Sequence, residues 1–173
     1  LALLDPERML IDDVIPCEDG HAQERSLLDQ VLPLIERRDL VIADRNFCTL
    51  KFLLGIRSRR GAFVIRQHGR MPWTSRSKPR YVGRCETGRM YEQVIELRDP
   101  ETGKTTQIRR ITLKLDKPTR DGDGEIHLLT NLPEKVTAMA FFSQRISTIQ
   151  AGDLLQNLKT NSSGKFDFQF IDP

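Results

Sequence analysis

The chain has 173 residues and a mass of 19.9 kDa, which is the size of one ordinary domain. Hydrophobic residues make up 38% of it, charged residues 29% and aromatic residues 6%, a composition that argues against disordered, collagen-like and membrane-spanning proteins. Cys17, Cys48 and Cys85 lie far apart, which favours neither a disulfide framework nor a CxxC metal site. We therefore expect a cytoplasmic protein without a membrane partner.

The net charge of +3 hides an uneven distribution. Residues 51–85, named the basic tract here, contain ten Lys and Arg and no Asp or Glu, whereas the rest of the chain holds 17 basic and 24 acidic residues. A solvated face usually mixes both signs, so the tract favours phosphate contacts over a plain surface role. The DNA contacts that we expect from it are Arg66, Arg70, Arg76, Lys78 and Arg80.

Two aromatic residues of the basic tract, Trp73 and Tyr81, allow two interpretations. Either ring can stack on an unpaired base, or it can anchor the loop to the core. We slightly favour anchoring.

The first elements in chain order are a strand and a helix. The apolar residues of Met9–Ile15 predict a short strand. Residues Ala22–Arg37 repeat apolar side chains at helical spacing and predict an amphipathic helix. Pro33 removes a backbone donor inside this segment and can end the helix early.

A strand, a helix and a second strand follow. Leu40–Ala43 is a continuous apolar run, which predicts a strand covered on both faces. Cys48–Ile56 predicts a helix and Ala62–Ile65 another buried strand. This order and spacing predict a βαβ unit with a parallel strand pair, and hence the α/β class.

The second half of the chain predicts antiparallel structure. Gly69–Gly88 is rich in Gly, Pro, Ser and Arg and predicts a loop or an extended arm. Alternating patterns predict strands, separated by segments of turn composition at 99–103 and 121–124. A helix is compatible with Val136–Lys159, although β-branched residues and Gly152 interrupt the pattern. The predicted strands are Met90–Leu97, Thr106–Leu115 and Ile126–Leu129.

Asp44 is the sharpest candidate for chemistry, because it directly follows the apolar run Leu40–Ala43. Ligands and metals gather at the carboxyl ends of strands in open α/β sheets, so a carboxylate there can hold a divalent cation. The alternative is that Asp44 caps the next helix or pairs with Arg45. Position alone favours capping.

Two stretches, CEDGHAQERSLL from Cys17 and DLVIADRNFCTLKFLLGI from Asp39, resemble the catalytic domain of bacterial DDE transposases of the insertion-sequence-four group. The phrases FVIRQHG from Phe63 and HLLTNLPEKVTA from His127 extend the resemblance over most of the chain. It implies a ribonuclease-H-like core with an antiparallel β-rich insertion. The expected parts are the first part of the core (residues 1–68), the basic arm and insertion (69–129), and a degenerate helical part of the core (130–173).

The resemblance also implies a site. Asp44 matches the second catalytic aspartate and metal ligand of the family, whose chemistry uses two Mg²⁺ or Mn²⁺ ions about 4 Å apart. We expect Arg45 beside it to contact DNA. The family's first aspartate would precede Leu1, so we interpret the chain as part of a larger domain.

The family's third carboxylate belongs to a helical signature of Tyr, Arg, Glu and Lys. Phe142 and Arg145 occupy the Tyr and Arg positions, Ile149 stands where Glu is expected, and Lys159 comes three residues late. A local frameshift or sequence decay is our hypothesis for this departure. By analogy, Arg145 and Lys159 are candidate phosphate contacts.

These observations predict a DNA-transposition protein of the bacterial cytoplasm and nucleoid, which binds transposon ends and target DNA and can act there as a homodimer. With an incomplete carboxylate set, we expect the chain alone to lack strand-cleaving activity. One alternative is a noncatalytic DNA-binding remnant of a decayed transposase. Another, an unrelated nuclease of the ribonuclease-H fold, requires three intact carboxylates that the sequence does not display.

Overall fold

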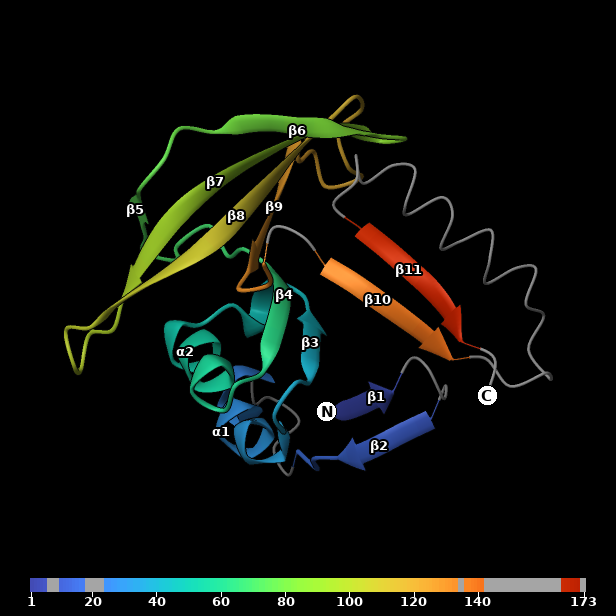
Figure 1. Ribbon diagram of the computed structural model, residues 1–173. Helices are drawn as coiled ribbons and strands as arrows, with labels where there is room; N and C mark the ends of the chain where they lie inside the picture. The colour runs from blue at the N-terminus through green and yellow to red at the C-terminus, as the bar shows by residue number, and fades with distance from the viewer. Residues whose placement is uncertain (6–9, 18–23, 134–135, 142–165, 172–173) are drawn as a thin grey trace.

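The computed structural model describes residues 1–5, 10–17, 24–133, 136–141 and 166–171 (Figure 1). Its main body is a mixed seven-stranded sheet in the order β3-β4-β9-β8-β7-β5, with β6 pairing β7. Two helices pack against this sheet, and a small hairpin lies beside it. The expected α/β class is confirmed.

The chain begins with a hairpin of β1 (Ala2–Asp5) and β2 (Leu10–Val14), paired antiparallel. β2 confirms the strand expected within Met9–Ile15. The Ile15 N–H donates to the Leu1 carbonyl at 2.8 Å and closes the hairpin at its open end. Ile15 is buried and ties the hairpin to the core.

The helix expected over Ala22–Arg37 is shorter in the structure. α1 (Leu28–Val31) lies between two 3-10 turns, Glu24–Leu27 and Leu32–Leu34, and Pro33 lies at the start of the second turn. Proline has no N–H to continue the α-helical ladder, which explains the early end. The predicted apolar face is nevertheless buried, as shown by Leu27, Leu28, Val31 and Ile35.

The predicted βαβ unit is confirmed. β3 (Leu40–Ala43) pairs parallel with β4 (Ala62–Arg66), and α2 (Leu50–Ser58) connects them. α2 begins two residues later than expected because Thr49 is its N-cap, whose Oγ1 accepts the Phe52 N–H at 3.2 Å. No helix in the described part of the chain is long and apolar enough to cross a bilayer.

The expectation that Leu40–Ala43 is covered on both faces is wrong. β3 is an edge strand of the sheet, and Leu40 and Ile42 are 48% and 71% exposed. A continuous apolar run is typical of a central parallel strand, but the edge position leaves alternate side chains uncovered.

The antiparallel part is formed by β7 (Gly88–Arg98), β8 (Thr105–Leu115) and β9 (Glu125–Thr130), which confirm the three predicted strands. β9 also pairs antiparallel with β4, so the hairpin strands continue the same sheet as the parallel pair. The turn segments connect these strands, with Gly103 and Gly122 at positive φ.

The arm expected over Gly69–Gly88 is only partly irregular. It contains the two-residue β5 (Thr74–Ser75) and β6 (Arg80–Cys85), and both pair with β7. The sequence did not predict β6, because Pro79 and Gly83 are residue types that are typical of loops. Gly88 ends the β6–β7 turn in a position that requires it, since a Cβ there would lie 2.0 Å from the Lys114 carbonyl oxygen.

Two further strands, β10 (Val136–Phe141) and β11 (Phe166–Ile171), pair parallel with each other. The helix considered from Val136 is therefore wrong for 136–141. Its remainder lies outside the described residues. Phe142, Arg145, Ile149 and Lys159 also lie outside them.

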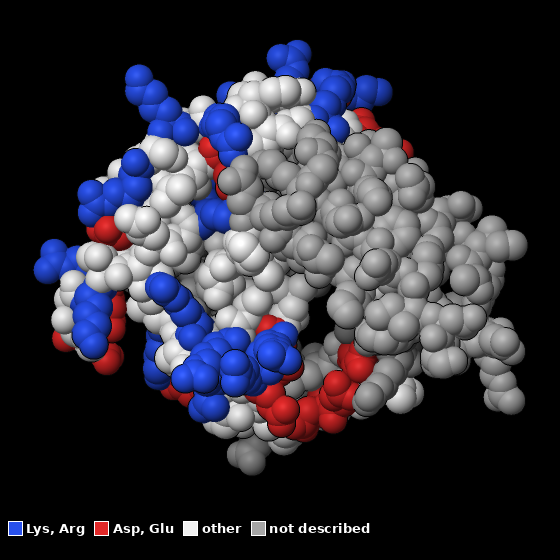
Figure 2. Space-filling view, viewed as in Figure 1, with Lys and Arg blue, Asp and Glu red and all other residues white. Residues whose placement is uncertain are grey.

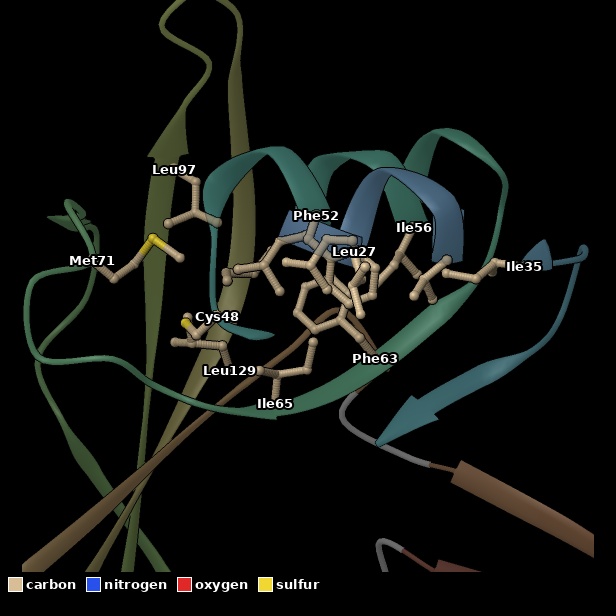
Figure 3. Packing of buried hydrophobic residues seen from close by; sticks show 14 of the residues in the cluster. Leu27, Ile35, Cys48, Phe52, Ile56, Phe63, Ile65, Met71, Leu97 and Leu129 are labelled. Atoms are coloured by element: carbon tan, nitrogen blue, oxygen red, sulfur yellow. The ribbon is translucent and has the colours of Figure 1, made fainter. Parts of the chain in front are cut away.

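The hydrophobic core lies between α2, α1 and one face of the sheet (Figure 3). Phe52 and Ile56 extend from α2 towards Phe63 and Ile65 of β4, and Leu53 is buried in the same cluster. Strands β7, β8 and β9 add Leu97, Ile108 and Leu129. α2 thus holds the parallel and antiparallel parts of the sheet in one core.

Replacing Phe52 by Ala should cost roughly 3–5 kcal/mol of stability, because the ring is 1% exposed at the centre of this core. The urea midpoint of unfolding measures the decrease. The control is Leu34→Ala, whose side chain is 41% exposed and should have a much smaller effect. Equal midpoints for the two variants would contradict the described packing.

Candidate nucleic-acid interface

Asp44 directly follows β3 and begins the 3-10 turn Arg45–Phe47. Its Oδ1 accepts the Asn46 N–H at 2.8 Å, and its carbonyl accepts the Phe47 N–H at 3.3 Å. Asp44 is therefore a capping residue, as its position alone favoured. The residue is exposed and its Oδ2 accepts no hydrogen bond from the described residues, so capping leaves one oxygen available to a ligand.

The turn that carries Asp44 is fixed from two sides. The Arg25 Nε donates to the Asn46 carbonyl at 2.9 Å and links the turn to the segment before α1. Cys48, at the end of the turn, is 4% exposed, and burial raises the pKa of its thiol. The exposed carboxylate therefore lies on a turn that the fold holds in place.

The described residues do not fit a two-metal site. Within the described ranges, no group of three His, Cys, Asp or Glu side chains lies close enough together to hold a metal ion. Asp44 supplies one carboxylate, and one carboxylate cannot hold two divalent cations against their hydration shells.

Several arginines of the basic tract are neutralised by ion pairs. Arg66 contacts Asp123 at 2.8 Å, and Arg84 contacts Asp116. Arg76 forms two hydrogen bonds to Glu96, at 2.5 and 3.0 Å, which lower the pKa of the Glu96 carboxyl. These three arginines tie the arm, β4 and β6 to other parts of the sheet, so a phosphate would have to compete with carboxylates for them.

The other expected contacts that lie within the described residues are exposed. Arg45, Arg70 and Lys78 are exposed and form no ion pair with any described residue. Arg80 is exposed on β6. Arg45 is adjacent to Asp44 in the chain, whereas Arg70 and Lys78 lie on the arm that follows β4. Among the expected DNA contacts, carboxylates therefore neutralise Arg66 and Arg76, whereas Arg45, Arg70 and Lys78 are open to a ligand.

Beyond the core, the sheet carries a polar row that sequence reasoning missed. The Arg110 guanidinium lies 5.0 Å from the centre of the Trp73 ring, and its Nε donates to Gln67 Oε1 at 2.6 Å. Trp73 is thus an anchor of the arm. Thr112, two residues further along β8, contacts His127 Nδ1 at 3.1 Å. The period-two spacing of Arg110, Thr112 and Lys114 is the sequence signal for this row.

A hollow of about 430 Å³ opens beside the polar row. Glu125 is its only acidic lining residue among those described, and it contacts Lys114 at 3.3 Å. Burial and the nearby Arg110 lower the pKa of His127, against the opposing effect of Glu125. The surface of the antiparallel part is therefore cationic here. The hollow is lined by Lys78, Pro79, Tyr91, Arg110, Thr112, Lys114 and Glu125.

Compared with known proteins, the chain matches no family model and no curated sequence. We therefore infer its function from its own residues and geometry.

Asp44→Ala should destabilise the chain by about 1 kcal/mol, because the N-cap acceptor is removed, whereas Asp44→Asn should be nearly neutral. Urea unfolding of the two variants measures the difference. If Asn costs as much as Ala, the cap is not the structural role of this side chain. A neutral Asn variant also removes the carboxylate charge without changing the fold, and is the matched variant for functional assays.

Proposed function

We propose that this chain is part of the catalytic domain of a DDE transposase and that it binds duplex DNA at transposon ends or targets. The observation that carries the proposal is the position of the exposed Asp44 at the carboxyl end of a parallel strand, with one carboxylate oxygen not used by the cap. That position agrees with the resemblance of the surrounding sequence to the family. The exposed Arg45 next to it supplies a cation for a phosphate.

The fold supports the finer assignment of a partial ribonuclease-H-like core. A parallel pair linked by α2 continues through β9 into an antiparallel extension, where the family carries its β-rich insertion. In the intact family, Mg²⁺ or Mn²⁺ supplies the chemistry of strand cleavage. The described residues of this chain contribute one carboxylate to such a site and exposed cations to the DNA backbone.

A noncatalytic DNA-binding remnant is the second candidate function. It is favoured by Ile149, which occupies the position of the family's glutamate and cannot act as an anionic ligand. Binding of DNA, assembly as a homodimer on it, and location at the bacterial nucleoid are proposed for both candidates. Metal-dependent cleavage separates them.

Salt-dependent binding to duplex DNA tests the shared part of the proposal. The affinity should fall linearly on a log–log plot against salt, and the triple variant R45Q/R70Q/K78Q should reduce the slope by about 0.9 for each phosphate that is no longer bound. The matched control is R98Q/K117Q/R120Q, which removes three exposed charges at the end of β7 and between β8 and β9. No binding by the unsubstituted chain, or equal slopes for both variants, would count against the proposed interface.

A nicking assay with Mg²⁺ or Mn²⁺ on supercoiled DNA separates the two candidates. We expect no cleavage by this chain, because Asp44 has no carboxylate partners among the described residues. Cleavage that disappears in the Asp44→Asn variant would instead establish a complete active site and contradict the remnant.

A further inference from the structure

Two turns meet at the amino ends of β3 and β4, opposite to the end that carries Asp44. The Arg38 N–H donates to the Arg60 carbonyl at 3.2 Å, and the Ala62 N–H donates to the Asp39 carbonyl at 2.7 Å. These bonds join the segment before β3 to the end of α2. Five arginines lie on the two joined turns and the last turn of α2, and we name them the arginine pole: Arg37, Arg38, Arg57, Arg59 and Arg60.

All five arginines of the pole are exposed, and none forms an ion pair with the described part of the chain. This separates them from Arg66, Arg76 and Arg84 of the basic tract, which are paired. The segment before β3 also contains Glu36 and Asp39, so segments 36–39 and 57–60 together hold five arginines and two carboxylates, a net charge of +3.

The carboxylates of Glu36 and Asp39 do not neutralise the arginines of the pole. Asp39 Oδ2 accepts the backbone N–H of Glu36 at 2.7 Å, which closes the turn before β3, and neither acid pairs with an arginine of the pole. Figure 2 shows Lys and Arg gathered over the lower part of this face, where α1 and α2 lie in Figure 1, next to a separate acidic strip. The lower part of this face therefore carries a cationic patch that borders an acidic one.

The backbone of the pole provides a second, independent observation. Arg38 and Arg60 have φ values of 78° and 64° and are the non-glycine residues at positive φ within the described ranges. Arg60 occupies the position after α2 that glycine usually takes, as shown by hydrogen bonds from the Gly61 N–H to the Ile56 carbonyl and from the Arg60 N–H to the Arg57 carbonyl.

Arginine is less favourable than glycine in this left-handed conformation, because its Cβ crowds the backbone. Both left-handed positions nevertheless carry arginine, and the two are joined to each other by a backbone hydrogen bond. Strain of this kind at paired positions points to a role for the side chains, since glycine would fold better.

We propose that the arginine pole binds the phosphodiester backbone of duplex DNA as a second contact surface, separate from the Asp44 end of the sheet. This inference takes duplex DNA as the ligand from the proposed function. It adds to that function a surface made of Arg37, Arg38 and three arginines of the basic tract. Unpaired guanidinium groups recognise phosphate oxygens through paired N–H donors, and several at one end of a domain contact successive phosphates.

The distance between the Asp44 end of β3 and the arginine pole determines how many base pairs a duplex must span to contact both. β3 carries Asp44 at one end and the pole at the other, and its length from Leu40 to Asp44 is about 13 Å at a rise of ~3.3 Å per residue. Base pairs are stacked ~3.4 Å apart, so a duplex that contacts both ends spans about four base pairs between them. The pole therefore positions the duplex and does not contact the same phosphate as Arg45.

The test uses two pole variants of the full chain and a short duplex as the probe. R37Q/R57Q/R59Q removes three charges at positions without backbone strain, and R38G/R60G removes two charges and the strain together. Both should weaken DNA binding and reduce the salt slope by about 0.9 for each phosphate released. R38G/R60G should also raise the melting temperature by roughly 2–4 °C, so that its weaker binding cannot result from unfolding.

The control is R98Q/K117Q/R120Q, which should retain the affinity and slope of the unsubstituted chain. If the unsubstituted chain binds DNA and both pole variants bind with the same slope, the pole is overturned while the proposed function stands. If the unsubstituted chain does not bind duplex DNA, the proposed function fails first. Binding of an acidic protein but not of DNA at the pole would also overturn the inference.

Discussion

The parallel pairing of β3 with β4 determines how the other elements are arranged. Parallel strands cannot be joined by a tight turn, so the chain must cross over the sheet through α2. That crossover buries Phe52, Leu53 and Ile56 against β4 and closes the core. It also sends both strands in one direction, which places Asp44 at one end of the pair and the turns with Arg38 and Arg60 at the other.

The charge that the surface offers to a ligand differs from the charge along the sequence. The ten cations of the basic tract lie in one segment that contains no acidic residue. In the folded chain, however, Arg66, Arg76 and Arg84 gain carboxylate partners from distant segments. Conversely, the arginine pole combines residues from within the tract with Arg37 and Arg38, which precede it. Exposed cations therefore lie at both ends of the parallel pair, with Arg45 at one end and the pole at the other.

Local patterns predicted β2, β3, β4, β7, β8 and β9 and the βαβ unit, because each depends on periodicity that a short segment contains. The early end of α1 follows from Pro33, and the period-two alternation of Thr105–Leu115 was sufficient to predict β8.

The exposure of Ile42 could not be predicted from the sequence, because it depends on the edge position of β3 in the sheet. The pairing of Arg76 with Glu96 likewise depends on the register in which β5 meets β7. At the candidate site, the sequence predicted the position of Asp44 after β3 and its capping role, which the structure shows, whereas its role as a metal ligand stays a prediction. The arginine pole was not predicted, because positive φ values and unpaired side chains are properties of the folded chain.

Hydrogen exchange of the full chain with and without duplex DNA is the most direct test of DNA binding at both ends of the parallel pair, because one measurement reports on both. We expect slower exchange on DNA binding around residues 36–40, 45–49 and 57–61, with little change in the β7–β8 turn at 99–104. DNA binding that protects the β7–β8 turn and leaves both ends of the parallel pair unchanged would contradict this arrangement.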